Sequence, residues 1–318
     1  MFDPNTNCTN APSQTASDAG VAGAGVLLSF IVTAGLALVL SLWIILQEIR
    51  RHSEAKIARK LLLSFSDQQI ITGIGLQSIG LAKADSMVSY HFFIIWMLAS
   101  ISTATHSAAL LALFNDFKRD WVLRWLRHFL MFVNLVLSLV YAVFILKDVT
   151  GQLAPTLAVQ CVWSSNSQTE SRSNMTLSVV GTIAVMVGQC LVFALAVWYL
   201  HSGSQKWLQP LRVLSMIILM IIGIGATIRV IFISQAFGTP SVALSDDGEK
   251  AWNFGQLLAL LLLLLPLISA VEIFRGEMKV PSPVVDDDDQ KPLFAQAVND
   301  GFEPNPFWNS QIRMKNIK

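Results

Sequence analysis

Five ionisable side chains lie inside long apolar stretches of this sequence, and their surroundings suit them for proton transfer. Placing such a side chain in hydrocarbon costs about 2.5–3.5 kcal/mol on insertion scales, so these residues usually face the interior of a helix bundle and often carry function. A carboxylic acid sheltered in this way stays protonated near neutral pH and can act as a general acid. The five are Asp67, His91, His106, Arg229 and Glu272.

These residues fall into two groups by their depth in the membrane, which we estimate from a rise of about 1.5 Å per helical residue. Asp67, His106 and Glu272 fall toward one end, which the charge distribution below makes cytosolic. We expect His106 to hydrogen-bond one of the two acids and to return the proton. The second group lies toward the opposite end and comprises Tyr90, His91 and Arg229.

Each ionisable residue also has a purely structural interpretation. The run Ser66-Asp67-Gln68-Gln69 is typical of a helix start, which would make Asp67 a boundary residue. Glu272 precedes Arg275 by three residues, so an interfacial ion pair is as good an explanation as chemistry. Arg229 is long enough to extend toward the lumenal headgroups.

Aromatic and amide side chains near the second group supply candidate contacts for a ligand. A belt of aromatic residues at the membrane interface accounts for most of them. Rings that turn inward instead could hold a cation against their faces. The candidate substrate-binding residues are Trp96, Arg229, Trp252 and Gln256.

The elements that position these residues are predicted to be membrane-spanning helices. Of the 318 residues, 53% are hydrophobic and only 14% are charged, and several stretches of more than 18 residues carry no charge. The composition predicts an all-α, seven-helix membrane bundle, with six helices and a re-entrant segment as the alternative, because the second span carries Asp67. The spans are 21–46, 61–82, 87–114, 129–146, 175–200, 211–236 and 252–274.

The positive charges predict the orientation of the bundle. Of the 22 Lys and Arg residues, 17 lie in the segments that would all face the cytosol, which are 47–60, 115–128, 201–212 and the tail from Arg275. The N-terminus is therefore predicted to be lumenal or outside, and the C-terminus cytosolic. This divides the chain into a lumenal segment 1–20, a membrane domain 21–274 and a disordered cytosolic tail 275–318.

Two further patterns fall on the predicted lumenal side. Asn7-Cys8-Thr9 and Asn174-Met175-Thr176 are acceptor sites for N-glycosylation at Asn7 and Asn174. Cys8 and Cys161 lie there too and could form a disulfide in an oxidising compartment.

Several function classes are excluded or disfavoured by composition and motif. A net charge of +1 gives no excess of positive charge to neutralise nucleic-acid phosphates. Three cysteines rule out a structural zinc module, and Asp286–Asp289 has no second acidic cluster with which to hold magnesium, so we expect no metal and no cofactor. Rhodopsin-like receptor motifs are missing, since Asn115-Asp116-Phe117 stands after the third span.

A set of short motifs in spans two to seven resembles a large family of filamentous-fungal integral membrane proteins. Some members of that family resemble the integral-membrane terpene cyclases of fungal meroterpenoid pathways. The motifs are Ser66-Asp67-Gln68-Gln69 with Gly73, the pair Tyr90-His91, Ser102 with Thr105-His106, and Trp252-Asn253-Phe254-Gly255-Gln256 leading to Pro266 and Glu272.

The resemblance implies a metal-independent enzyme that cyclises a prenylated, farnesyl-type aromatic compound or its epoxide. Asp67 or Glu272 would protonate the substrate, with His106, Tyr90 and His91 assisting, and aromatic faces would stabilise the carbocation. The partners would be a lipophilic small molecule, membrane lipid and other enzymes of the pathway, in the endoplasmic reticulum or another internal membrane. The alternatives are a receptor or sensor, and a transporter or accessory protein in which Arg229 contacts an anion.

Overall fold

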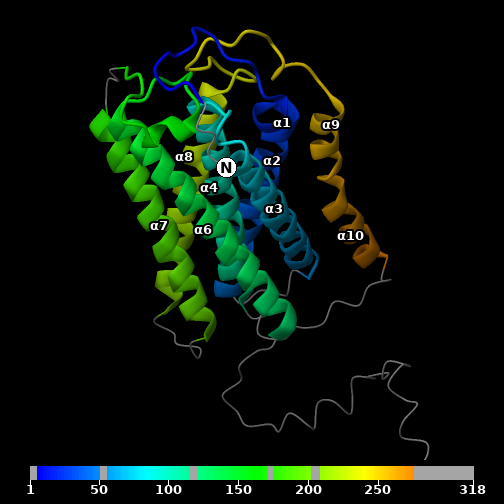
Figure 1. Ribbon diagram of the computed structural model, residues 1–318. Helices are drawn as coiled ribbons and strands as arrows, with labels where there is room; N and C mark the ends of the chain where they lie inside the picture. The colour runs from blue at the N-terminus through cyan, green and yellow to red at the C-terminus, as the bar shows by residue number, and fades with distance from the viewer. Residues whose placement is uncertain (1–5, 51–55, 115–120, 171–174, 202–207, 276–318) are drawn as a thin grey trace, which may run out of the picture. The chain divides into compact units, whose positions relative to one another are not determined.

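The computed structural model describes residues 6–50, 56–114, 121–170, 175–201 and 208–275 (Figure 1). These residues lie within one compact unit, Met1–Val284, whereas the second unit, Val285–Lys318, falls outside the described ranges. Every regular element in these ranges is helical: α1 (Ala19–Ala22), α2 (Ala24–Ile49), α3 (Lys56–Ala82), α4 (Ser89–Ala112), α6 (Trp121–Gly151), the 3₁₀ helix η1 (Val159–Trp163), α7 (Met175–His201), α8 (Leu208–Ile233), α9 (Phe254–Leu261) and α10 (Leu264–Phe274).

Five helical stretches of the described chain are long and apolar enough to cross a membrane, as expected of a helical membrane protein. They are Ala19–Ile49, Ser89–Ala112, Arg124–Gly151, Met175–Trp198 and Gln209–Ile233. The other two predicted spans correspond to α3, which is long but carries charges, and to the shorter apolar stretch Phe254–Ile268. The prediction of seven spans therefore stays a prediction.

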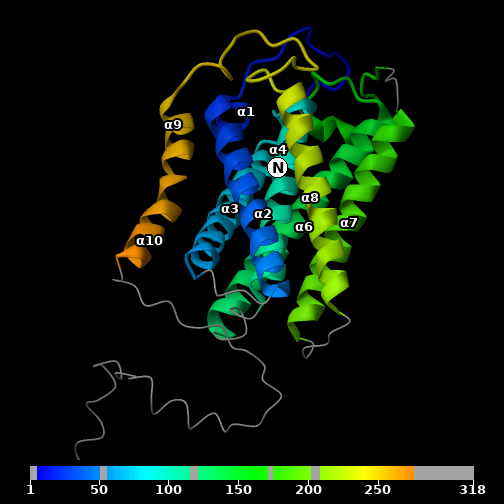
Figure 2. The ribbon, with the colours of Figure 1, turned by 180° about the vertical axis from the view of Figure 1, so that it is seen from behind.

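Helix α4 is the centre of the bundle, with α2, α3, α6, α7 and α8 packed around it (Figures 1 and 2). Nearly every side chain of α4 is buried, including those of His91 and His106. A helix that is apolar on all sides is suited to such a position, because every face can pack against a neighbour. Residues of α4 therefore reach any cavity in the interior of the bundle.

Buried amides join the inner helices through direct hydrogen bonds. The Gln77 side-chain amide of α3 donates to Asn134 Oδ1 of α6 at 2.8 Å, and the Asn134 amide donates to the Thr103 hydroxyl of α4 at 3.1 Å. Gly73 makes room for this contact, since a Cβ there would lie 2.9 Å from Asn134 Oδ1. These hydrogen bonds offset part of the cost of burying amide groups in the interior of the bundle.

The last apolar stretch is interrupted where one continuous helix was predicted over 252–274. Pro266 lacks an N–H and its ring collides with the carbonyl four residues earlier, at Leu262. Helix α9 accordingly ends at Leu261, and α10 begins at Leu264, which leaves the proline in the first turn of the new helix, where it is tolerated.

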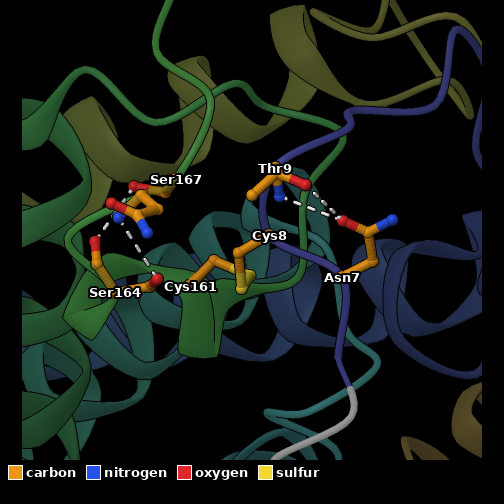
Figure 3. Close-up of a disulfide and its surroundings, with 7 residues drawn as sticks. Asn7, Cys8, Thr9, Cys161, Ser164 and Ser167 are labelled. Carbon is orange, nitrogen blue, oxygen red and sulfur yellow. Dashed lines mark hydrogen bonds between the residues drawn. A yellow bond between two sulfur atoms is a disulfide. The ribbon is translucent and has the colours of Figure 1, made fainter.

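A disulfide joins Cys8 to Cys161 across 153 residues (Figure 3). The sequence had shown that these two cysteines could pair. Cys161 is fully buried and packs with Leu153 and Leu157. We call this end of the bundle the disulfide end, and it also contains the residues that follow α8. The disulfide fixes the N-terminal segment against the loop between α6 and α7.

The N-terminal segment is also attached to the loop that precedes α9. The Thr15 N–H donates to the carbonyl of Ala243 at 3.0 Å. Hydrogen bonds from the Ser17 hydroxyl and then from the Gly248 N–H lower the pKa of Asp246, so this carboxylate keeps its charge at neutral pH. The two loops and the N-terminal segment together cover the disulfide end (Figures 1 and 2).

Candidate functional site

A cavity of about 840 Å³ lies among α4, α6, α7 and α8, beginning at the disulfide end. Its lining changes in character with depth. Ser89, Asp148 and Glu170 line it at the disulfide end, whereas Met97 and Ile218 line it deeper in the bundle. The cavity is therefore amphipathic, with a polar rim and an apolar floor.

Aromatic side chains from successive turns of α4 form one wall of the cavity. Tyr90, Phe93 and Trp96 all line it, and the Phe93 and Trp96 rings lie 5.8 Å apart in an edge-to-face arrangement. Residues three apart are neighbours on a helix surface, so one helix supplies the whole wall. The predicted contact residue Trp96 and the predicted catalytic residue Tyr90 thus meet at one cavity.

Arg229 reaches the same cavity from α8. Its guanidinium carbon lies 5.4 Å from the centre of the Phe93 ring, within the range of a cation–π interaction. The side chain lines the cavity with Asp148 and Glu170, yet it makes no ion pair with any residue in the described ranges. Arg229 therefore brings a positive charge to the aromatic wall.

Asp148 is placed in the cavity by the way α6 ends. The helix continues to Gly151, and Gln152 adopts a left-handed φ of 51°, which is typical of the residue after a helix C-terminus. Asp148 therefore lies in the last turn, where it is buried and accepts a hydrogen bond from the Ser89 hydroxyl at 3.3 Å. Sequence reasoning missed this acid, because the span was predicted to end at 146, before Lys147.

Behind the aromatic wall lies a buried cluster built around Glu249, whose side chain is fully buried. The Tyr90 hydroxyl donates to Glu249 Oε2 at 3.1 Å, and His91 Nε2 lies 2.9 Å from Glu249 Oε1. The backbone N–H of Gln235, just after α8, donates to both the Glu249 carboxylate at 3.2 Å and the Tyr90 oxygen at 3.0 Å. The cluster thereby connects α4, the end of α8 and the loop before α9.

Glu249 was missed by sequence reasoning, which assigned residues 237–251 to a loop. The loop has no periodic pattern that would indicate a buried position. The one available signal was the predicted polar group of Tyr90 and His91, which needed a partner from some other part of the chain. Arg229 was expected to join that group, but in the structure it contacts Phe93 instead. The Tyr90 hydroxyl points to Glu249, which does not line the cavity, so Tyr90 presents its ring there.

A scan of the chain against protein-family models gives no match. Comparison with curated proteins and with solved structures also gives none. Function must therefore be inferred from the residues themselves.

Asp67 lies far from a helix start and outside the cavity. Helix α3 begins at Lys56, so Asp67 occupies its middle, and the helix-cap interpretation is wrong. Both carboxylate oxygens accept hydrogen bonds from Arg127 of α6, at 2.8 Å each. This bidentate pair occupies both oxygens of the Asp67 side chain. The geometry therefore does not favour the expected role of Asp67 as a general acid.

The expected contact of His106 with Asp67 or Glu272 is absent. His106 is fully buried, and neither of its ring nitrogens has a hydrogen-bond partner. Glu272 is half-buried near the end of α10, and it does not line the cavity. Its predicted ion pair with Arg275 is also not observed. The three residues of the predicted cytosolic group are thus not joined by hydrogen bonds.

Two predicted ligand contacts have other surroundings. Trp252 is 60% exposed and does not line the cavity. Gln256 is buried, and its side chain accepts from the Gly25 N–H at 3.1 Å and donates to the Ala251 carbonyl at 2.9 Å. Gln256 therefore attaches α9 to the start of α2, a structural role.

The predicted glycosylation site at Asn7 is exposed beside the disulfide (Figure 3). Asn7 Oδ1 accepts hydrogen bonds from the Thr9 hydroxyl and the Thr9 N–H, both at 3.0 Å. Asn174 lies outside the described residues. No group of three or more His, Cys, Asp and Glu side chains in the described ranges could hold a metal ion.

Proposed function

We propose that the protein binds a lipophilic small molecule that enters the cavity from the bilayer. The observation that carries the proposal is the position of the lining on the bundle surface. Leu177 of α7 and Ile221 of α8 line the cavity and are 73% and 65% exposed, so apolar side chains border it on the side that lipid would cover. Its volume of about 840 Å³ falls in the range of roughly 300–1,000 Å³ typical of small-molecule sites.

Purified protein in lipid nanodiscs should bind a radiolabelled farnesylated phenol saturably, because the apolar floor takes the chain and the polar rim takes the hydroxyl. Equilibrium binding measured against empty nanodiscs checks this. Uptake that rises linearly with probe concentration and equals that of empty nanodiscs would mean that the cavity does not bind such a ligand.

The proposal includes seven spans, with the disulfide end lumenal and the membrane internal, such as the endoplasmic reticulum. Support comes from the Lys and Arg distribution and from the disulfide, since disulfides persist in oxidising compartments. Helix α3 and the α9–α10 pair supply the remaining two spans. Other enzymes of a pathway in the same membrane would deliver the ligand.

Expression in yeast should give a glycosylated protein whose electrophoretic mobility increases on treatment with a glycosidase. Asn7→Gln and Asn174→Gln should each remove one step of this shift, because both acceptors lie on the proposed lumenal side. An acceptor site introduced into 115–128 serves as the control and should stay unmodified. If that control site alone is modified, the orientation of the protein is the opposite of the one proposed.

A second function, cyclisation of the bound molecule, is favoured by the aromatic wall and by Asp148. Ring faces stabilise a carbocation, and an acid at the rim can start the reaction. Asp148 transfers a proton to an alkene or epoxide, ring closure moves the cation along the chain, and a neighbouring C–H returns a proton to the Asp148 carboxylate. The reaction is an isomerisation and needs no further reactant. The proposal thus replaces Asp67 and Glu272 with Asp148.

Asp148→Asn should lower turnover of a farnesylated phenol epoxide at least 100-fold while the substrate still binds, because the amide cannot donate the proton. Product formation in microsomes, measured by mass spectrometry at matched protein level, checks this. Asp67→Asn and Glu272→Gln are the controls, and both should retain turnover. If either control loses turnover while Asp148→Asn stays active, the general acid is Asp67 or Glu272 and not Asp148.

A further inference from the structure

Arg229 is a positive charge without a carboxylate partner in a cavity that contains two acids. Asp148 and Glu170 line the same cavity, but no described carboxylate lies within ion-pair distance of the guanidinium. An arginine at membrane depth is strongly unfavourable unless something offsets its charge, and such residues usually mark the path of a ligand. Within the described part of the chain, the cation–π contact recorded for this guanidinium is with the Phe93 ring.

The direction of the side chain argues against a role at the lipid headgroups. A snorkelling arginine extends along the outside of its helix toward the membrane surface. Arg229 is an exposed residue, but its guanidinium lies over the ring of Phe93, which belongs to the central helix α4 and lines the cavity. The charge is thus presented to the cavity.

We propose that the ligand carries a carboxylate that pairs with Arg229. This inference rests on the proposed function, because it requires the cavity to be a binding site. A guanidinium matches a carboxylate through two parallel hydrogen bonds, which a neutral ester cannot reproduce. The prenyl chain then occupies the apolar part of the cavity beside Trp96 and Met97.

A carboxylate on the ligand also makes the cavity compatible with cyclisation. An unpaired guanidinium beside Phe93 would repel a carbocation that passes along the aromatic wall. Pairing with an anion removes this repulsion. The same contact therefore serves recognition and chemistry.

The test compares two probes that differ only in charge, a farnesylated hydroxybenzoic acid and its methyl ester, on protein in nanodiscs at pH 7. Wild-type protein should bind the acid at least tenfold more tightly than the ester. Arg229→Gln should abolish this preference, measured as the ratio of acid to ester affinity, and Arg229→Lys should retain part of it. Size-exclusion chromatography confirms that each variant is folded.

The outcomes separate the inference from the proposed function. Equal binding of acid and ester, or a preference for the acid that survives in Arg229→Gln, would overturn the carboxylate assignment while the cavity remains a binding site. Absence of saturable binding for both probes would instead overturn the proposed function. Nanodiscs with and without phosphatidylserine form the final arm, and loss of acid binding in the anionic lipid would identify a phospholipid headgroup as the partner of Arg229.

Discussion

Glu249→Ala is expected to lower the free energy of unfolding by about 3–5 kcal/mol, the usual effect of removing one partner from a buried charged cluster. The truncation leaves the Tyr90 hydroxyl without its acceptor, removes the contact of His91 with the carboxylate, and leaves the Gln235 N–H with only the Tyr90 oxygen. Unfolding by SDS titration in mixed micelles, followed by circular dichroism, measures the change. The expected result is a large fall in the transition midpoint.

Asp247→Ala is the matched control for this variant, since it removes an acid two positions away. The Asp247 side chain is 79% exposed and pairs with Lys250. Surface pairs of this kind contribute about 0–1 kcal/mol, so the control should unfold close to the wild-type midpoint. If the two variants unfold together, the Glu249 cluster does not hold the disulfide end of the bundle in place.

Gly225→Leu is expected to reduce ligand binding more than tenfold with little change in stability. Gly225 lines the cavity, and a Cβ built on it meets no heavy atom within 4 Å, so a leucine side chain enters open space that a ligand would use. The substitution also replaces glycine with a better helix former, by about 1 kcal/mol. Binding of the farnesylated phenol in nanodiscs measures the loss.

Gly75→Leu on α3 provides the control, because Gly75 also has no neighbour within 4 Å of a Cβ but does not line the cavity. The two variants add the same side chain at an exposed position of a long helix. Gly75→Leu should therefore bind the probe as the wild type does. Undiminished binding in Gly225→Leu would place the ligand elsewhere in the protein.

The positions of the long helices could be predicted from the sequence because gaps between charges mark apolar stretches. Their ends could not, because a helix continues beyond its apolar part wherever its charges find partners. Helix α3 begins at Lys56 and not at 61, and α6 begins at Trp121 and not at 129. Arg127, placed by its charge in a loop, consequently faces Asp67 from a helix.

The same reason explains which parts of the candidate site were predictable. Tyr90, Trp96 and Arg229 were found because a polar or aromatic residue within an apolar stretch stands out. Asp148 did not stand out, because Lys147 marked the end of the span. Lys147 is accommodated over the Trp163 ring at 5.5 Å, which allows α6 to continue past it.

The Cys8–Cys161 disulfide can form only after both cysteines have been synthesised. Its two cysteines are 153 residues apart, so at about 5–20 residues per second the second leaves the ribosome roughly 8–30 s after the first. During that interval Cys8 is a free thiol at the centre of the Asn7 acceptor sequence. Oxidation then holds Cys8, the middle residue of that sequence, in the disulfide. In the folded protein the Thr9 N–H and hydroxyl donate hydrogen bonds to Asn7 Oδ1 (Figure 3). A glycan added to Asn7 during that interval would therefore meet an acceptor sequence whose central thiol is still free.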